Sequence, residues 1–325
     1  MKSRMHVLVC SAGTIVSFLL SCAALGQSYP AKPVRVLIGF AAGSSTDVVM
    51  RIIGPKLTEV WGNQVIVDNR AGAGGNIAAE MVAKSTPDGY ALLFANGGIA
   101  IAPSLYKNLP YNARTDLAPV ALVTTMPHIM CVNRSLPVKS VTDFIALARG
   151  KPGQVLFSSA GIGNSDHMAA ELFAYMAGIK MTHVPNKGGP QALNDVIAGE
   201  VAVTFPALQT CLPQARAGKV RALAVTSAKR SAAAPDIPTM QESGVAGYEH
   251  TLWYGLFAPA GTPPAVVSKV SADISRVIAS GDVHDRFAAS GIATVGSSPA
   301  EFAQFFQAEL DKWAKVIKAT GIKIE

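Results

Sequence analysis

Residues 34–61 read VRVLIGFAAGSSTDVVMRIIGPKLTEVW, and this stretch decides the fold class. The apolar run at 34–40 has the length and composition of a buried strand, and residues 47–61 place apolar side chains at helical spacing. A glycine-serine loop, GSSTD at 43–47, lies between them. A strand, a glycine-rich loop and a helix in this order predict an α/β sheet protein.

The same alternation of strand and helix continues along the chain. Strands at 64–68 and 90–95, with a helix at 76–84 between them, complete a βαβαβ unit, for which we expect a parallel sheet. A second series has strands at 154–158, 182–185, 201–205 and 221–225 and helices at 165–177 and 191–198. Two further helices are predicted at 265–279 and 299–320. Two separate series predict two α/β lobes rather than one long sheet.

Two extended apolar stretches could connect these lobes. They lie at 120–132, with Pro127 near the middle, and at 248–259. If the C-terminal helices return to the first sheet, the second lobe is an insertion tied by two crossing segments. We therefore expect lobe 1 at 27–126 and 248–325 and lobe 2 at 127–247. Such a hinged clamshell lets a ligand shift an equilibrium between open and closed forms.

Composition excludes several classes of protein. The 325 residues are 50% hydrophobic and 15% charged, which is too apolar for intrinsic disorder. The length suits two lobes, because a single core stops growing near this size. The net charge of +7 is spread along the chain, without the basic stripe and interleaved aromatic residues of nucleic-acid binders. We expect no nucleic-acid partner and a monomeric protein.

The first 26 residues are interpreted as a signal peptide. Lys2 and Arg4 precede an uncharged apolar run at 7–20, and small residues predict cleavage after Gly26. The protein is therefore expected in the periplasm. A membrane anchor is an alternative, but the run is shorter than the roughly 20 residues that span a bilayer. Lipid attachment at Cys22 is another, which the bulky Leu20 disfavours.

Cysteine and histidine usage predicts neither metal nor cofactor. Cys131 and Cys211 remain after cleavage, in a compartment that permits a disulfide. The apolar surroundings of Cys131 favour a buried free thiol, although pairing stays open. No CxxC, HExxH or His–Cys cluster is present, so no metal site is expected. Residues 72–77, GAGGNI, have Ile77 at the third glycine position of a dinucleotide fingerprint, which favours a tight turn.

Two glycine-serine loops, at 43–47 and 158–166, follow the first strands of the two lobes. Ligands of α/β sheets bind at this end of the strands, and helix N-termini bind anions without Arg or Lys. Helix capping is the alternative, because Ser44-x-x-Asp47 fits a capping box and Asn164 or Ser165 fits an N-cap. His167 could contact ligand or only pack against the loop. Facing one another across a cleft, the loops would suit a small carboxylate, bound directly or through water.

Several stretches together carry a resemblance to a known family. They are YPAKPV at 29–34, DNRAGAGGNI at 68–77, DGY at 88–90, LPVKS at 136–140, HVP at 183–185, AGKVRALAVT at 217–226 and WYGLFAPAGTP at 253–263. From about Tyr29 to its end, the chain resembles the Bug (TctC-type) extracytoplasmic solute receptors of tripartite tricarboxylate transport systems. Departures from the family pattern fall at Gly39, Ser44, Asn164, Asn186 and Pro206.

The resemblance implies a type II periplasmic-binding-protein fold. It also implies that a ligand carboxylate lies between the two lobe loops, held partly through ordered waters. The contacts carried onto this chain are Gly43, Ser44, Ser45, Thr46, Asp47, Ser158, Ser159, Gly161, Asn164, Ser165 and His167.

Two functions are therefore compared. The first is a periplasmic receptor that captures a small carboxylate (an organic acid, an acidic amino acid or an aromatic acid) and delivers it to membrane permease subunits. The second is a secreted α/β hydrolase acting on a small carboxylate or ester, with Ser44 or Ser165 as nucleophile and His167 as base. The sequence contains no nucleophile elbow, metal set or paired base, which favours the receptor and a protein that is not an enzyme.

Overall fold

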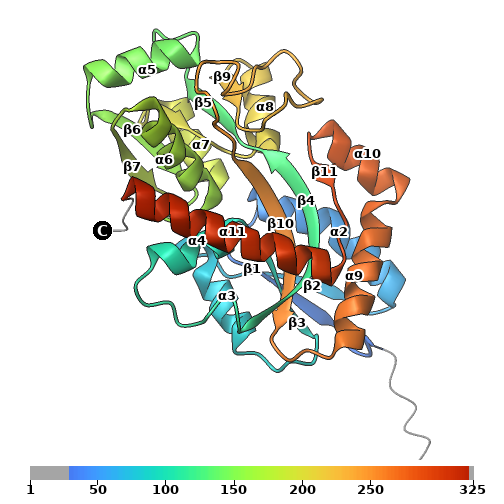
Figure 1. Ribbon diagram of the computed structural model, residues 1–325. Coiled ribbons are helices and arrows are strands. Elements are labelled where there is room, and N and C mark those ends of the chain that lie inside the picture. Colours follow the sequence, from blue (N-terminus) through green and yellow to red (C-terminus); the bar gives the residue numbers. More distant parts are fainter. Residues whose placement is uncertain (1–28, 322–325) are drawn as a thin grey trace, which may run out of the picture.

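The computed structural model describes residues 29–321, which form two β-sheets flanked by helices (Figure 1). The predicted signal peptide, its cleavage site and Cys22 lie outside the described residues. The first sheet has the order β11-β4-β10-β3-β1-β2, and the second has the order β7-β6-β8-β5-β9.

The strands of the first sheet are β1 (Val34–Ile38), β2 (Val65–Asn69), β3 (Ala91–Asn96), β4 (Leu117–Pro127), β10 (Thr251–Pro259) and β11 (Ala293–Thr294). Those of the second are β5 (Ile129–Asn133), β6 (Val155–Ser159), β7 (Met181–Pro185), β8 (Val203–Thr204) and β9 (Val220–Val225). The chain enters the second sheet between β4 and β5 and returns between β9 and β10. The expected two α/β lobes with two crossing segments are thus present, while their assigned boundaries stay a prediction.

The parallel pairing expected for the βαβαβ unit is confirmed, and each antiparallel pair includes a strand outside that unit. Strand β1 pairs in parallel with β2 and β3, whereas β10 pairs antiparallel with both β3 and β4. In the second sheet β5 is antiparallel to β8 and β9. The mixed pattern has a simple cause, because β4 leaves the first lobe and β10 returns to it, so the two strands run in opposite directions.

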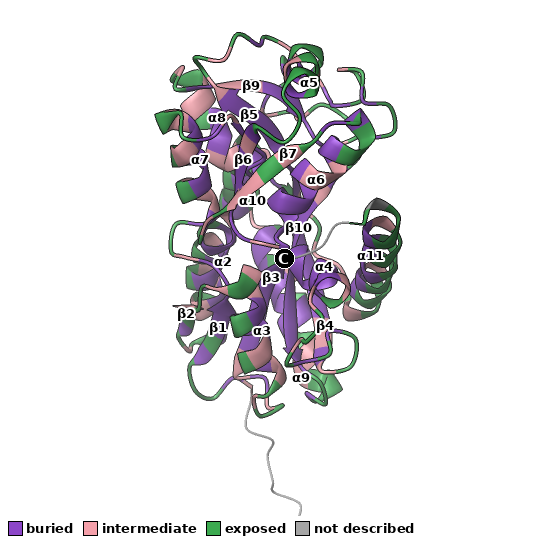
Figure 2. Cartoon of the chain, turned by 90° about the vertical axis from the view of Figure 1, so that its left-hand side faces the viewer, coloured by how far each residue is buried: buried purple, intermediate pink, exposed green. Residues whose placement is uncertain are grey.

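The helices are α2 (Ser45–Trp61), α3 (Asn76–Ala83), α4 (Gly98–Leu105), α5 (Val141–Gly150), α6 (Ser165–Ala177), α7 (Gly189–Ala198), α8 (Leu208–Arg216), α9 (Pro264–Ile278), α10 (Gly281–Ala289) and α11 (Pro299–Thr320). A short 3-10 helix, Ala73–Gly75, precedes α3. Helix α11 packs against α4 and β4 and shows its exposed face along one side of the molecule (Figure 2). The C-terminal segment therefore belongs with the first sheet. No helix in the described part of the chain is both long and apolar enough to cross a membrane.

Helices cover both faces of the first sheet. Val36 and Ile38 of β1 pack in one apolar cluster with α2 and α9, and Leu37 packs in another with α3, α4 and α11. Successive strand residues point to opposite faces, so a strand with both faces covered is apolar throughout. This is why 34–38 reads as a nearly continuous apolar run.

The expectation of a free thiol at Cys131 is wrong. Cys131 on β5 and Cys211 on α8 form a disulfide, and both residues are fully buried. Helix α8 is not among the elements that the sequence predicts. The sequence therefore did not indicate that Cys211 lies beside the strand that contains Cys131. The disulfide ties α8 to β5 of the second sheet.

Candidate functional site

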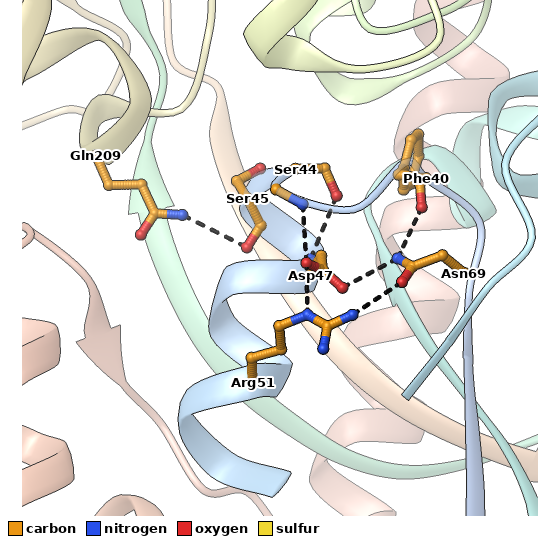
Figure 3. A network of polar contacts seen from close by, with 8 residues as sticks. Phe40, Ser44, Ser45, Asp47, Arg51, Asn69 and Gln209 are labelled. Carbon is orange, nitrogen blue, oxygen red and sulfur yellow. Dashed lines mark hydrogen bonds and ion pairs between the residues drawn. The ribbon is translucent and has the colours of Figure 1, made fainter. Parts of the chain in front are cut away.

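The loop after β1 places a capped helix N-terminus at the cleft. Ser44 is the N-cap of α2, and its Oγ accepts a hydrogen bond from the Asp47 N–H at 3.3 Å. Asp47 Oδ2 accepts from the Gly43 N–H and from Arg51 Nε, both at 2.8 Å, and its Oδ1 accepts from Asn69 Nδ2 at 3.0 Å (Figure 3). Burial opposes ionisation, but these bonds hold the pKa of Asp47 below its usual value. Asp47 is therefore an ion-paired carboxylate.

The loop after β6 mirrors this arrangement in the second lobe. Asn164 is the N-cap of α6, and its Oδ1 accepts from the Ser165 N–H at 2.8 Å. Asp166 Oδ2 accepts from the Ala160 N–H at 2.7 Å, and its Oδ1 accepts from the His167 N–H at 2.9 Å. No lysine or arginine pairs with Asp166 within residues 29–321, and burial raises its pKa to about 6. The two loops match in shape but differ in charge.

The two lobes contact one another directly across the cleft. Asn96 Nδ2, at the end of β3, donates to Asn164 Oδ1 at 2.7 Å. Tyr106 Oη donates to the Ile162 carbonyl at 3.1 Å, and Gln209 Nε2 donates to the Ser45 carbonyl at 3.4 Å (Figure 3 shows the last). The structure is thus a closed clamshell.

A small polar cavity of about 20 Å³ lies between the loops. Its walls come from both lobes and from the crossing segments, and they include Ser44, Ser45, Thr46, Asn96, His128, Asn164, Asp166, Pro206 and Thr210. A cavity of this volume holds about one water molecule. We refer to it as the inner cavity.

A larger pocket of about 360 Å³ adjoins the inner cavity, with Phe40 and Ala160 lining both. We call it the outer pocket. Its wall is mostly apolar or backbone, and the polar side chains come from Tyr106, Asn186 and Lys187. In this closed form the inner cavity can hold one bridging water, and the outer pocket can receive the body of a small molecule.

The structure brings together some of the predicted contact residues. Ser44, Ser45, Thr46 and Asn164 line the inner cavity, and Gly161 lines the outer pocket. The other six, Gly43, Asp47, Ser158, Ser159, Ser165 and His167, line neither space. They lie in the same two loops or the helix starts that follow them.

The hydroxyls of the second-lobe serines have partners inside the protein. Ser158 Oγ donates to the Ala192 carbonyl at 2.7 Å, and Ser159 Oγ lies 2.6 Å from His183 Nε2. Both serines are fully buried. They support the loop from behind in this closed form, and whether they reach a ligand stays a prediction.

Ser165 links the two crossing segments. Its Oγ lies 2.9 Å from Nε2 of His128, between β4 and β5, and 2.9 Å from Nε2 of His250, just before β10. His250 Nε2 also lies 3.0 Å from the Ser165 carbonyl, which can only accept, so this nitrogen carries a proton. Ser165 Oγ then accepts from His250 and donates to His128. Burial lowers the pKa of His128 to about 4, so the ring is neutral at neutral pH.

These contacts do not support the hydrolase alternative. His167 Nδ1 accepts from the Gly163 N–H at 3.1 Å and does not pair with Ser165. Ser165 has no exposed surface, and in the described residues Ser44 Oγ bonds only the Asp47 backbone. A nucleophilic serine needs a base within hydrogen-bond reach and access to substrate, and neither serine has both.

Sequence reasoning missed Asn96 and His128, which line the inner cavity, and Tyr254, which is buried close to Ser45 and Thr46. The Tyr254 hydroxyl is buried and has no hydrogen-bond partner within residues 29–321. Burial raises the pKa of Tyr254, and the nearby Ser45 and Thr46 side chains lower it by a smaller amount. Asn96 could have been found, because it ends a parallel strand beside β1, where ligands of such sheets bind. The other two lie on crossing segments, whose placement needs the three-dimensional structure.

The site offers no group of three or more histidine, cysteine, aspartate or glutamate side chains able to hold a metal ion, as far as the described residues show.

Comparison with known proteins places these observations in a family. A family model described as tripartite tricarboxylate transporter family receptor (TctC) matches residues 49–322. Protein BugT of Bordetella pertussis is 35% identical over 301 residues, which cover 92% of each chain. The chain is also similar to two solved structures, R. palustris Rpa4515 with adipate and the periplasmic binding protein BugD.

Both structural likenesses extend over nearly the whole described chain. The Rpa4515 structure has a TM-score of 0.87 and 35% identity, covering 91% of this chain and 99% of that one. The BugD structure has a TM-score of 0.87 and 32% identity, covering 91% and 100%. The predicted periplasmic-binding-protein fold is confirmed.

Proposed function

The chain belongs to the tripartite tricarboxylate transporter receptor (TctC) family, a family of solute-binding proteins rather than enzymes, and from this premise we propose that it captures a small carboxylate between its two lobes. One observation carries the proposal. Two capped helix N-termini, one from each lobe, enclose a polar cavity that lies beside a mostly apolar pocket. Helix N-termini stabilise anions through unpaired N–H groups and the helix dipole.

The ligand is proposed to place a carboxylate at the inner cavity and its body in the outer pocket. The inner cavity has room for about one water in the closed form, so a water can bridge the carboxylate to the loops. The outer pocket of about 360 Å³ is in the range of small-molecule sites. Lys187 at its wall would favour a second anionic group. An organic acid, an acidic amino acid or an aromatic acid fits this division, and adipate in Rpa4515 is of that class.

The cellular role follows from the family. The protein is proposed to reside in the periplasm after cleavage of the signal peptide, to bind its ligand there, and to deliver it to the permease subunits of a tripartite transporter. Support comes from the family description and from the periplasmic relative BugD.

A screen of carboxylic acids tests the proposal. Mono- and dicarboxylates, adipate among them, are added to the protein, melting temperature is recorded, and the acids that raise it are measured by calorimetry. We expect at least one to bind at micromolar concentration, which corresponds to about 8 kcal/mol. The bound acid should be recovered chemically unchanged. Turnover of the acid, or stabilisation by none of them, would contradict the proposal.

Replacing Ser44 by alanine tests the first-lobe loop. Ser44 and Ser140 are both N-caps, each accepts from an aspartate N–H three residues later, and each aspartate accepts from the backbone four residues back. Either substitution should cost about 1 kcal/mol of stability. Only Ser44→Ala should also weaken ligand binding, by about 1 kcal/mol or roughly fivefold in calorimetry, because only Ser44 lines the inner cavity. If Ser44→Ala and Ser140→Ala bound the ligand equally well, Ser44 would not contribute to ligand binding.

A further inference from the structure

Asp166 is the acidic residue in the wall of the inner cavity. Its side chain is buried, with 3% of the residue exposed, and both oxygens accept backbone N–H groups of its own loop. Asp47 has the matching place in the first lobe, but it pairs with Arg51 and does not line the cavity. A ligand anion between the loops therefore lies beside one carboxyl group that lacks a counter-ion.

Among the described residues, no lysine or arginine forms an ion pair with Asp166. His167 follows it on α6 and accepts a backbone N–H through Nδ1; burial raises the pKa of Asp166 more than the nearby His167 lowers it. His128 and His250, on the crossing segments, are buried and bonded to Ser165, and burial lowers the pKa of both. His183 on β7 also has a lowered pKa, about 3, through burial and then through His167.

The remaining ionisable groups near the cavity do not act as a counter-ion for Asp166 either. Tyr254 on β10 has a raised pKa, mainly through burial, so its hydroxyl is neutral. The Arg51 guanidinium is bound to Asp47, and Glu171, on the next turn of α6, lies 3.6 Å from His167. Among residues 29–321, no lysine or arginine lines the inner cavity. An ionised Asp166 would be the only net charge in its wall.

Two carboxylates in one enclosed site repel, and such a pair holds one proton between them at pH values where each alone is ionised. A proton on Asp166 removes the repulsion and adds an O–H donor for the ligand carboxylate, while the backbone N–H groups can still bond the remaining lone pairs. The proton comes from solvent, so the protein–ligand complex gains one proton and no bond is broken in the ligand.

We propose that Asp166 takes up a proton when the lobes close on a ligand carboxylate beside the inner cavity, so that capture is linked to proton uptake. This inference rests on the proposed function. The pKa of Asp166 without ligand is about 6, and a neighbouring anion raises it further. Above about pH 6 the free protein must gain the proton on binding, so affinity falls as pH rises. Below pH 6 Asp166 is already protonated, and affinity levels off.

Calorimetry tests this with adipate, malate and benzoate as probes at pH 6.5, 7.5 and 8.5, where the acids themselves are ionised. We expect the affinity of wild-type protein to fall by about tenfold per pH unit. Repeating each titration in two buffers of different ionisation enthalpy should report close to one proton taken up. This count needs no variant.

Substitutions assign the proton to its residue. Asp166→Asn removes the titrating group, so its affinity should no longer depend on pH; because its amide nitrogen replaces one of two accepting oxygens, the test compares the pH dependence and not the absolute affinity. Glu171→Gln, on the same helix, should keep the wild-type slope. Asp47→Asn should weaken binding yet keep the slope, because its carboxylate is already paired with Arg51.

The outcomes separate this inference from the proposed function. Binding of a probe with pH-independent affinity and no proton uptake would overturn the role of Asp166 and leave the receptor function standing. The role of Asp166 would also be overturned if the affinity of Asp166→Asn fell with rising pH as steeply as that of wild type. Failure of all three probes, and of every acid in the screen, at each pH in wild type and Asp166→Asn would overturn both.

Discussion

Gly74, in the 3-10 helix between β2 and α3, lies against the second lobe. A Cβ built there would be 2.4 Å from the Ile162 carbonyl oxygen, and the φ of Gly74 is +64°. Gly62, the C-cap of α2, has φ of +63° with open space around the Cβ position. The two residues have the same backbone conformation and differ in whether the other lobe is near.

Comparing Gly74→Ala with Gly62→Ala separates backbone strain from obstructed closure. Each variant should lose about 1 kcal/mol of stability, because alanine disfavours positive φ. Gly74→Ala should also bind ligand at least tenfold more weakly, since its methyl group would hold the lobes apart, whereas Gly62→Ala should keep wild-type affinity. Thermal melting and calorimetry measure the two effects. Equal affinities would show that closure does not bring these loops together.

At the scale of single residues, sequence predicts which loops form the site better than which atoms face it. The hydroxyls of Ser44 and Ser158 look equivalent in sequence, as each stands near the end of a first strand. The structure differs because Ser158 meets the Ala192 carbonyl of α7. That partner is 34 residues away, so no local pattern specifies it. Asp166 is a similar case, because its missing counter-ion is a property of the folded site.

Among the elements, α11 is hydrogen-bonded to strand β10 of the first sheet through one buried carboxylate, that of Glu309. Glu309 Oε2 accepts from Nε1 of Trp253 on β10 at 3.1 Å and from Nε1 of Trp313 on α11 at 3.3 Å. Both tryptophans are 1% exposed. The Glu309 carboxylate, paired with Lys312, thus accepts from two buried indole N–H groups.

Glu309→Ala should destabilise the protein by about 2–4 kcal/mol, because it leaves two buried N–H groups without an acceptor. Asp311→Ala, on the same helix, removes an exposed ion pair to Arg114 and should cost less than about 1 kcal/mol. Denaturant unfolding measures both. Glu309→Gln, which keeps an acceptor, should recover part of the loss. If the two alanine variants were equally stable, the buried bonds would contribute little.

Predictability of the elements follows their local signals. Helices α6 and α11 were predicted with their observed bounds, since each begins at a capping residue and continues with regular apolar spacing. Helices α4, α5, α8 and α10 were not predicted. Proline does not account for this, because Pro55 lies inside the predicted α2, and neither α5 nor α10 contains a proline. The missed α8 is also why the Cys131–Cys211 disulfide was not foreseen.

For the whole molecule, the restart of the strand–helix series predicted two lobes, but nothing in the sequence indicated how they close. The closed form depends on pairs far apart in the chain: Asn96 with Asn164, Tyr106 with Ile162, and Gln209 with Ser45. An inner cavity of about 20 Å³ has no space for an entering carboxylic acid. Ligand entry therefore requires the lobes to separate first.

Tyr106→Phe tests whether these direct contacts hold the empty protein closed. It removes the hydroxyl that bonds the Ile162 carbonyl across the cleft, and Tyr111→Phe removes one that bonds Asn76 Oδ1 at 2.6 Å within the first lobe. A net hydrogen bond contributes about 1 kcal/mol, so Tyr106→Phe should raise the ratio of open to closed protein about fivefold. Small-angle X-ray scattering without ligand should then show a larger radius of gyration for Tyr106→Phe than for wild type or Tyr111→Phe. Tyr111→Phe should instead lower the melting temperature while the radius stays the same. If all three proteins scattered alike, the balance between open and closed forms would depend on the crossing segments and not on contacts at the mouth of the cleft.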